Sequence, residues 1–241
     1  MSVPATIESP ATEARTLIAR SLDAVVVPPY YQDDYVAIWH GNNQELLSLM
    51  PACDLLLTDP PYGIGEGRRK QILSRANAAK ATDYGDNVWD NQPAPDWMIG
   101  LARAKTQRQI IWGGNYYSLP PSRAWLVWDK DNGENDFADC ELAWTNLETA
   151  VRKLKYRWAG MLQENMSDKE TRYHPTQKPR PLMGWCIEKA MPCRTVLDPW
   201  MGSGTTLVAA KERRLTAFGI EADERQCENA AKRLSQEPLA L

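Results

Sequence analysis

Histidine and phenylalanine are scarce in this chain of 241 residues, which contains only two of each. Neither histidine, His40 or His174, has a visible base–nucleophile partner, and this argues against a hydrolase with a Ser–His–Asp triad. The five cysteines are widely spaced and form no C-x-x-C pair. Neither a disulfide framework nor a zinc site is therefore indicated, and such cysteines fit the reducing cytoplasm.

Long apolar runs are also lacking. No run approaches the ~20 residues that a membrane-spanning helix needs, so no membrane partner is expected. The N-terminus lacks a basic start followed by an apolar stretch, so no cleaved secretory signal is expected. The apolar fraction of 43% and the charged fraction of 24% are those of an ordinary folded protein.

A net positive charge is missing too, because 28 Lys and Arg face 31 Asp and Glu, a formal charge of -3. Taken alone, this average argues against a nucleic-acid partner. The charge is unevenly distributed, however. Residues 65–80 hold five basic and one acidic residue, and residues 151–180 hold eight basic and three acidic. Phosphate contacts are therefore expected at these two segments.

The chain is expected to form one large domain after an N-terminal arm. Residues 1–34 are rich in Pro, Ala, Ser and Thr, and they predict a loosely ordered arm with a short helix near residues 13–22. Residues 35–241 are expected to form a single domain with a flexible, Gly- and Asn-rich loop at residues 63–95.

Within the domain, short apolar strands alternate with helices. Residues 53–58 are apolar nearly throughout, which is typical of a strand buried on both faces. The alternation predicts an α/β fold with a doubly wound, mostly parallel sheet. Strands are expected at residues 35–39, 53–58, 109–112, 124–128, 140–144, 195–197 and 216–220, and helices at residues 43–50, 95–105, 179–190, 205–213 and 224–235.

A glycine turn connects a predicted strand to a predicted helix at residues 198–206. A phosphate-binding P-loop needs a Lys where Thr205 stands, and a dinucleotide fingerprint needs a third Gly where Leu207 stands. The remaining ligand is S-adenosyl-L-methionine, whose ribose diol needs a carboxylate at the end of the next strand. Glu221 lies there, 23 residues after Asp198. The expected cofactor-binding residues of this unit are Asp198, Pro199, Trp200, Gly202, Ser203, Gly204, Thr205 and Glu221.

A second motif, Asp59-Pro60-Pro61-Tyr62, follows the buried strand at residues 53–58. Methylation of an amino group on a base requires acceptors for both N–H groups. The Asp59 carboxylate and the Pro60 carbonyl supply two acceptors, and proline fixes the backbone that aims the carbonyl. Tyr62 can stack on a base that has left the duplex. These four residues, Asp59, Pro60, Pro61 and Tyr62, are the expected catalytic residues.

Through these two motifs the chain resembles the amino-group DNA methyltransferases, the N6-adenine and N4-cytosine family, from about residue 36 to residue 234. That family carries Asp-Pro-Pro-Tyr and Asp-Pro-Phe-x-Gly-Ser-Gly-Thr-Thr, with Trp200 replacing Phe here. The catalytic motif precedes the cofactor turn, which is the permuted order of the family's beta group. The resemblance implies the Rossmann-like methyltransferase fold in circularly permuted motif order, S-adenosyl-L-methionine as the cofactor and DNA as the partner.

The resemblance adds two expected cofactor-binding residues. Residues 174–179, His-Pro-Thr-Gln-Lys-Pro, resemble the family's element beside the methionine end of the cofactor, and this assigns Lys178 to the cofactor site. The family commonly has Gly-Asp after its first strand, whereas this chain has Gly41-Asn42. An Asn side-chain carbonyl can accept the same hydrogen bond from the adenine amine of the cofactor, so Asn42 is a candidate.

The expected DNA contacts lie in the two basic segments. Residues 145–173 resemble a short target-recognition insertion, and their length predicts a short or relaxed recognition site. Interleaved aromatic and basic side chains are typical of nucleic-acid contacts, although a solvated amphipathic helix has the same pattern. The candidates are Arg68, Arg69, Lys70, Arg152, Lys153, Lys155, Arg157 and Trp158, whereas Trp112, Trp125, Trp128 and Trp144 are expected in the core.

The predicted function is site-specific transfer of a methyl group from S-adenosyl-L-methionine to adenine N6 in DNA, with no metal. Asp59 at the first motif position resembles the adenine enzymes more than the N4-cytosine enzymes, which often have Ser there. N4-cytosine methylation and a non-catalytic nucleic-acid-binding module stay open as alternatives. A homodimer and a cognate restriction nuclease stay open as protein partners. Cys193 follows a proline, as the nucleophile of C5-cytosine methyltransferases does, but it precedes the cofactor strand and is expected to be structural.

Overall fold

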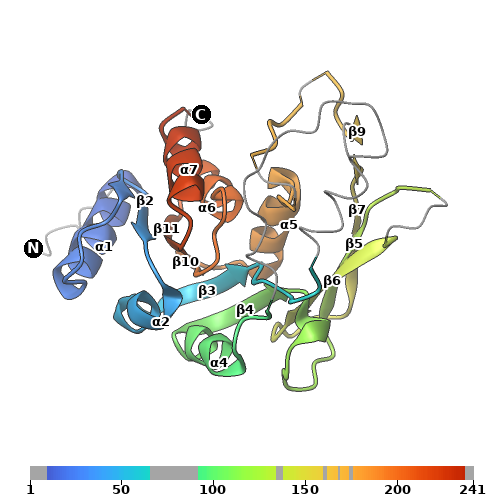
Figure 1. Ribbon diagram of the computed structural model, residues 1–241, viewed down its shortest axis with the longest axis horizontal. Coiled ribbons are helices and arrows are strands. Elements are labelled where there is room, and N and C mark those ends of the chain that lie inside the picture. Colours follow the sequence, from blue (N-terminus) through green and yellow to red (C-terminus); the bar gives the residue numbers. More distant parts are fainter. Residues whose placement is uncertain are drawn as a thin grey trace, which may run out of the picture.

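The computed structural model describes residues 10–65, 92–133, 138–159, 162–167, 169–173 and 176–236 (Figure 1). Its helices are α1 (Pro10–Ala24), α2 (Asn43–Leu46), α4 (Asp96–Ala104), α5 (Arg180–Ala190), α6 (Thr205–Glu212) and α7 (Glu224–Gln236). Its strands are β1 (Tyr31–Gln32), β2 (Val36–His40), β3 (Cys53–Thr58), β4 (Thr106–Trp112), β5 (Trp125–Asp129), β6 (Cys140–Thr145), β7 (Arg152–Lys155), β8 (Trp158–Ala159), β9 (Leu162–Gln163), β10 (Thr195–Asp198) and β11 (Thr216–Glu221). Short 3-10 helices span Leu47–Leu49 and Gly114–Tyr116.

Nine of these strands form one sheet in the order β1-β2-β11-β10-β3-β4-β6-β5-β7. The five strands from β2 to β4 in this order are parallel to one another. Strand β1 is antiparallel to β2, β6 is antiparallel to both β4 and β5, and β7 is parallel to β5. The expected α/β fold with a mostly parallel sheet is confirmed. Strands β8 and β9 form a separate short hairpin.

Helices cover both faces of the sheet, as buried parallel strands require. Helices α5, α6 and α7 lie on one face, and α2 and α4 lie on the other (Figure 1). The apolar run of β3 serves both layers, because Leu55 and Leu57 belong to one buried cluster and Leu56 belongs to the other. Three of the four tryptophans expected in the core, Trp112, Trp128 and Trp144, are buried.

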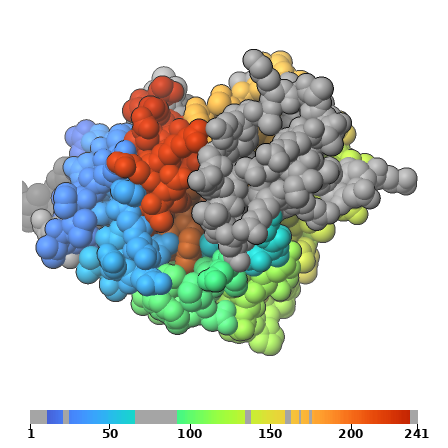
Figure 2. Space-filling model, in the orientation of Figure 1, coloured from blue at the N-terminus to red at the C-terminus, as the bar shows by residue number. Residues whose placement is uncertain are grey.

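The N-terminal arm differs from the expected loose segment. Helix α1 is longer than the helix expected at residues 13–22, and its Ala14 and Ile18 side chains are only 3% and 4% exposed. Asp33 forms an ion pair with Lys211 of α6 at 2.6 Å. In the space-filling view the N-terminal segment (blue) and α7 (red) form one continuous surface (Figure 2). The described part of the arm therefore packs on the domain.

The expected insertion at residues 145–173 is also partly built into the sheet. Strand β7 pairs with β5, with Leu126 opposite Arg152 and Asp129 opposite Lys155, and it forms the edge of the sheet. Most of the expected loop at residues 63–95 lies outside the described residues, and residues 92–95 lead directly into α4. Among the described residues, no helix combines the length and apolar character that crossing a membrane would require.

Packing of α1 can be tested at Ile18, which shares a buried cluster with Trp39 and Phe218. We expect Ile18→Ala to lower the free energy of unfolding by about 2–5 kcal/mol, the usual cost of removing a buried aliphatic side chain. Arg20→Ala, at an exposed position of the same helix, should change it by less than about 0.5 kcal/mol. Urea titration followed by circular dichroism measures both, and equally small effects would show that α1 is not packed.

Candidate active site

A cavity of about 630 Å³ lies at the carboxyl ends of the central parallel strands. Its wall contains Asp59 just after β3, Asp198 at the end of β10 and Glu221 at the end of β11. The carboxyl ends of parallel strands meet at one edge of a sheet, where α/β proteins bind their ligands. The structure thus brings the Asp-Pro-Pro-Tyr motif and the glycine turn together in one site.

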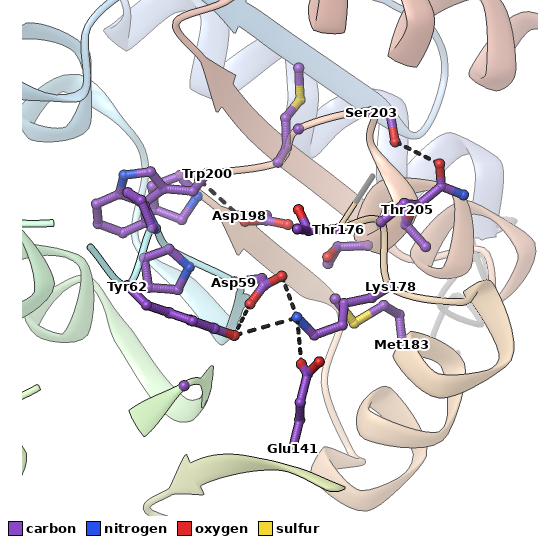
Figure 3. A pocket seen from close by; sticks show the side chains of 18 of the residues that line it. Asp59, Tyr62, Glu141, Thr176, Lys178, Met183, Asp198, Trp200, Ser203 and Thr205 are labelled. Carbon is purple, nitrogen blue, oxygen red and sulfur yellow. Dashed lines mark hydrogen bonds and ion pairs between the residues drawn. The ribbon is translucent and has the colours of Figure 1, made fainter. Parts of the chain in front are cut away.

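The Asp59 carboxylate is held by two side chains (Figure 3). The Tyr62 hydroxyl donates a hydrogen bond to one oxygen, and Lys178 Nζ donates to the other at 2.5 Å. Burial raises the pKa of Asp59, and the ammonium group of Lys178 opposes this by stabilising the carboxylate. Lys178 was expected at the cofactor site, but its charged end contacts the catalytic motif.

Glu141 of β6 is a site residue that the sequence analysis missed. Its carboxylate lies 3.0 Å from Lys178 Nζ and 2.5 Å from Lys130 Nζ. Burial alone would raise the pKa of Glu141, but Lys178 and Lys130 lower it to about 2. Burial would likewise lower the pKa of Lys178, and Asp59 and Glu141 raise it above its ordinary value. The cavity therefore contains a charge-balanced group of two carboxylates and two ammonium groups.

Close packing fixes the Tyr62 ring. Gly113 has φ +64°, and a methyl group there would lie 2.0 Å from the ring, so glycine is required. The Tyr116 ring stacks on Tyr62 with centroids 5.0 Å apart and an interplanar angle of 18°. The Tyr117 hydroxyl donates to the Pro61 carbonyl at 2.5 Å, which anchors the backbone of the motif. Tyr62 therefore presents an aromatic ring in one fixed orientation.

The glycine turn is tied to the carboxylate of Glu221. Gly202 and Gly204 have φ +51° and +77°, values that favour glycine, and α6 begins directly after them. The backbone N–H groups of Gly202 and Asp223 donate to the two oxygens of Glu221, both at 2.9 Å. Burial raises the pKa of Glu221. These bonds hold an acceptor at the end of β11, where the ribose diol of the expected cofactor would need one.

Asp198 connects the glycine turn to the neighbouring strand. Its Oδ1 accepts hydrogen bonds from the Thr58 hydroxyl at 2.7 Å and from the Trp200 N–H at 3.2 Å. The residue is 2% exposed, and burial raises the pKa of its carboxyl group to about 7. Asp198 lines the cavity, and these bonds fix the turn against β3.

Two adjacent asparagines differ in their surroundings. Asn42 caps α2, because its side-chain oxygen accepts from Gln44 N at 2.9 Å. Asn43 is buried, and its Nδ2 donates to the Pro199 carbonyl at 2.5 Å. Among the described residues, Asn43 Oδ1 has no hydrogen-bond partner. Both line the cavity, and Asn43 is the better candidate for the acceptor role expected of Asn42.

Unpartnered acceptors at the cavity wall test whether the expected cofactor fits. Buried polar atoms rarely stay without a partner. Within the described part of the chain, Gln226 Oε1 is in the same situation as Asn43 Oδ1, and both residues line the cavity. Together with Glu221 they offer three acceptors to a ligand with an amine and hydroxyl groups. S-adenosyl-L-methionine is such a ligand, so the residues present fit it.

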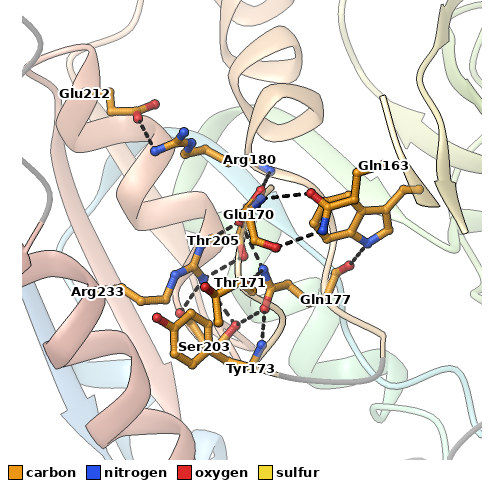
Figure 4. A network of polar contacts seen from close by, with 11 residues as sticks. Gln163, Glu170, Thr171, Tyr173, Gln177, Arg180, Ser203, Thr205, Glu212 and Arg233 are labelled. Carbon is orange, nitrogen blue, oxygen red and sulfur yellow. Dashed lines mark hydrogen bonds and ion pairs between the residues drawn. The ribbon is translucent and has the colours of Figure 1, made fainter. Parts of the chain in front are cut away.

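A buried guanidinium supports the glycine turn from behind (Figure 4). Arg233 of α7 is 4% exposed and donates to the Ser203 carbonyl at 2.8 Å and to the Thr205 hydroxyl at 3.0 Å. Its other nitrogen donates to Glu170 at 2.8 Å. Glu170 also accepts from Gln177 Nε2 at 3.0 Å. Arg233 thus connects the turn to the segment that leads to Lys178.

Three of the expected DNA-binding cations, on β7 and just after it, are paired with carboxylates. Lys153 pairs with Asp129 at 3.0 Å, and Lys155 and Arg157 pair with Asp131 at 2.9 and 2.8 Å. These pairs are solvent-exposed, and exposed ion pairs are worth only about 0–1 kcal/mol. DNA phosphates can therefore compete with the two carboxylates for these cations.

Trp158 departs from its expected role in DNA contact. It is 5% exposed, and its Nε1 donates to the Gln177 carbonyl at 2.9 Å. The Arg172 guanidinium lies 4.7 Å above the ring. Trp158 is therefore a buried residue of the cavity wall and is not exposed on the outer surface. The other expected contacts are Arg152, exposed on β7, and Arg68, Arg69 and Lys70, which lie outside the described residues.

The surroundings of Cys193 support its expected structural role. The side chain is buried, and burial raises the pKa of its thiol to about 11. The thiolate is the nucleophilic form of cysteine, so a neutral thiol gives no support to C5-cytosine chemistry.

The role of Arg233 can be tested by removing its hydrogen bonds to the turn. We expect Arg233→Met to weaken S-adenosyl-L-methionine binding by about tenfold or more, equivalent to at least ~1.4 kcal/mol, because the turn loses its support. Isothermal titration calorimetry measures the affinity, and circular dichroism checks that the variant is folded. Glu212→Gln is the matched control, because it breaks the neighbouring Arg180–Glu212 pair. A folded Arg233→Met variant that binds like wild type would contradict the expectation.

Comparison with known proteins gives a family match. Residues 86–233 match the family model of the N6/N4 methyltransferases, described as DNA methylase. The match covers more than half of the chain. It includes the glycine turn and Lys178, whereas the Asp-Pro-Pro-Tyr motif precedes it.

Curated relatives agree with this match. The chain is 26% identical to the type II methyltransferase M.ScaI of Streptomyces caespitosus, over 88% of this chain and 86% of the relative. It is 24% identical to the type II methyltransferase M2.DpnII of Streptococcus pneumoniae, over 88% of this chain and 94% of the relative.

Two solved structures illustrate the likeness in fold. The M1.HpyAVI–SAM complex aligns with a TM-score of 0.53 and 20% identity, over 83% of this chain and 98% of that one. The PvuII DNA methyltransferase, described as cytosine-N4-specific, aligns with a TM-score of 0.57 and 14% identity, over 90% and 92%. The expected family, fold, cofactor and DNA substrate are confirmed. The chain belongs to the N6/N4 DNA methylase family and is an amino-group DNA methyltransferase that uses S-adenosyl-L-methionine.

Proposed function

We propose that this DNA methyltransferase methylates the N6 amine of adenine. The observation that carries the proposal is the Asp59 carboxylate, held by Tyr62 and Lys178 in the cavity that also contains Glu221 and the glycine turn. A carboxylate at the first motif position is the feature in which the chain resembles the adenine enzymes.

In the proposed mechanism, Asp59 and the Pro60 carbonyl each accept one N–H of the target amine. Bound S-adenosyl-L-methionine supplies a methyl group on a sulfonium, which reacts without a covalent enzyme intermediate. Transfer of that methyl group would leave the amine with a positive charge, and Asp59 would take the proton that the amine then loses. Asp59, Pro60 and Tyr62 contribute chiefly by alignment, which can lower a barrier by about 7–11 kcal/mol.

The proposed cofactor contacts come from the turn at residues 198–206, from Glu221 and from the asparagines at the start of α2. Glu221 accepts from the ribose diol, and Asn43 accepts from the adenine amine with its unpartnered oxygen. The target base has to leave the duplex, because its amine cannot reach Asp59 from within the stack. Tyr62 then stacks on the base, in the orientation that Gly113 permits.

Cytosine is the second candidate base, because its amine has the same neighbouring group as that of adenine. Its N4 amine and the adjacent ring nitrogen have the same donor–acceptor order as N6 and N1 of adenine. The acceptors proposed above therefore fit both amines. Mass spectrometry of the digested DNA distinguishes the two products, N6-methyladenine and N4-methylcytosine.

The base can be identified from the product. We expect that DNA of mixed sequence, incubated with the enzyme and S-adenosyl-L-methionine and digested to nucleosides, contains N6-methyladenine by mass spectrometry. Asp59→Ala should abolish turnover, because an acceptor for the amine is lost, while cofactor affinity stays within about tenfold, or ~1.4 kcal/mol. N4-methylcytosine as the product would refute the base assignment. Unchanged turnover in Asp59→Ala would refute the role of Asp59.

DNA contact at β7 predicts a change in salt dependence. We expect Lys155→Gln to reduce the slope of log K against log salt by about 1, because one phosphate contact is lost. Asp131→Asn should strengthen DNA binding, because it releases Lys155 and Arg157 from their ion pair. Lys232→Gln, at an exposed ion pair on α7, is the control. Fluorescence anisotropy over a salt series measures the slopes, and three equal slopes would exclude DNA contact at β7.

A further inference from the structure

The ammonium group of Lys178 is the best-defined donor beside Asp59. Its side chain is 5% exposed, and it lines the cavity. Lysine is rarely buried, because removing its charge from water is costly unless carboxylates compensate. Here Nζ lies 2.5 Å from Asp59 Oδ2 and 3.0 Å from Glu141 Oε2 (Figure 3). Lys178 is therefore held charged at one defined point in the cavity.

The number of its donors leaves one N–H for a ligand. An ammonium group has three N–H bonds and no acceptor. Nζ donates to Asp59 and, over 3.4 Å, to the Tyr62 hydroxyl, whereas its 3.0 Å ion-pair contact with Glu141 Oε2 lacks hydrogen-bond geometry. The distance to the Tyr62 hydroxyl is at the long end of the hydrogen-bond range, so a better acceptor can displace the hydroxyl. Asp59 can accept further bonds as well, because each carboxylate oxygen has two lone pairs.

An acceptor and a donor side by side match one edge of an amino base. In adenine the N6 amine and the N1 acceptor are attached to the same carbon atom, and in cytosine the N4 amine and N3 are arranged in the same way. Enzymes that extrude a base read this Watson–Crick edge by hydrogen bonds. Asp59 and Lys178 present the complementary pair with the required close spacing.

We propose that Lys178 donates a hydrogen bond to the ring nitrogen beside the target amine, so that Asp59 and Lys178 together recognise an amino base. The inference rests on the proposed function, in which Asp59 accepts from that amine. Guanine and thymine have the reverse order, a carbonyl oxygen and a ring N–H. In the same pose they would place oxygen against carboxylate and N–H against ammonium, so the pair excludes them from the site.

Glu141 acts in this arrangement as a positioning residue. It has a second cation, Lys130, at 2.5 Å, so its charge does not depend on Lys178 alone. Through its 3.0 Å contact it keeps the ammonium beside Asp59 when the amine arrives. The negative charges of Asp59 and Glu141 also reduce the extent to which the ammonium group of Lys178 withdraws electron density from the ring of the base. This role accounts for the carboxylate that β6, a strand far from both motifs in sequence, places in the cavity.

Base analogues test the proposal with the enzyme unchanged. In 1-deazaadenine a C–H group replaces N1, and in 7-deazaadenine a C–H group replaces N7 on the other edge. We expect kcat/KM for wild type to fall about tenfold to hundredfold with 1-deazaadenine at the target position, the usual cost of losing a hydrogen bond to a charged donor. The change with 7-deazaadenine should be less than about threefold, and a wild type that methylates 1-deazaadenine as well as adenine would overturn the proposal.

The variant Lys178→Met isolates the contribution of Lys178. The altered reactivity and pairing of 1-deazaadenine affect wild type and variant equally, so the adenine/1-deazaadenine ratio should be about tenfold to hundredfold lower in the variant than in wild type. An unchanged ratio would overturn the proposal. Glu141→Gln, measured as a second variant in case Lys178→Met does not fold, should lower the ratio as well. A wild-type ratio in that variant would equally contradict the inference.

Cofactor affinity and the identity of the methylated base separate this proposal from its alternatives. If Lys178→Met weakens cofactor binding more than tenfold and leaves the ratio unchanged, Lys178 belongs to the cofactor site and the inference is wrong. Failure of the proposed function is visible earlier, as the absence of N6-methyladenine from unmodified DNA. In that case 3-deazacytosine, which lacks the corresponding ring nitrogen, replaces 1-deazaadenine, and the same ratio decides the role of Lys178.

Discussion

The ion pair between Asp59 and Lys178 is the interaction on which the site depends. A carboxylate at the bottom of a cavity is stable only with a partner, because burial without one costs several kcal/mol. The partner comes from a residue 119 positions later in the chain. The charge of the Asp59 carboxylate in the cavity is therefore compensated by Lys178 only when the segment before α5 lies beside it. The local structure of the Asp-Pro-Pro-Tyr motif is not sufficient to compensate this charge.

Adjacent residues of that segment face the two halves of the site. Gln177 hydrogen-bonds to Glu170 and Ser203, and so it belongs to the network that Arg233 builds behind the glycine turn. Lys178, the next residue, belongs to the group around Asp59. A short stretch of chain, Gln177 and Lys178, thus connects the glycine turn with the carboxylate of the Asp-Pro-Pro-Tyr motif. Displacement of this stretch would disturb both.

The sequence was sufficient for the parts of the fold that depend on local pattern. The apolar run before Asp59 predicted β3 with its correct bounds, and the glycines after Asp198 predicted the turn and the start of α6. It was insufficient for Glu141, whose position in the cavity follows from the antiparallel pairing of β6 with β4. The sequence did not predict the burial of Trp158 either, because alternating basic and aromatic residues do not reveal which face a strand buries.

The place of Arg233 in the chain has a consequence for biosynthesis. Helix α7 follows every other described helix and strand in sequence, so the ribosome releases it after them. Until it emerges, the glycine turn lacks the guanidinium that holds the Ser203 carbonyl and the Thr205 hydroxyl. A nascent chain can already have formed β3 and β10 while its cofactor turn is still unsupported. The order of elements therefore places the support of the glycine turn by Arg233 after the synthesis of β3 and β10.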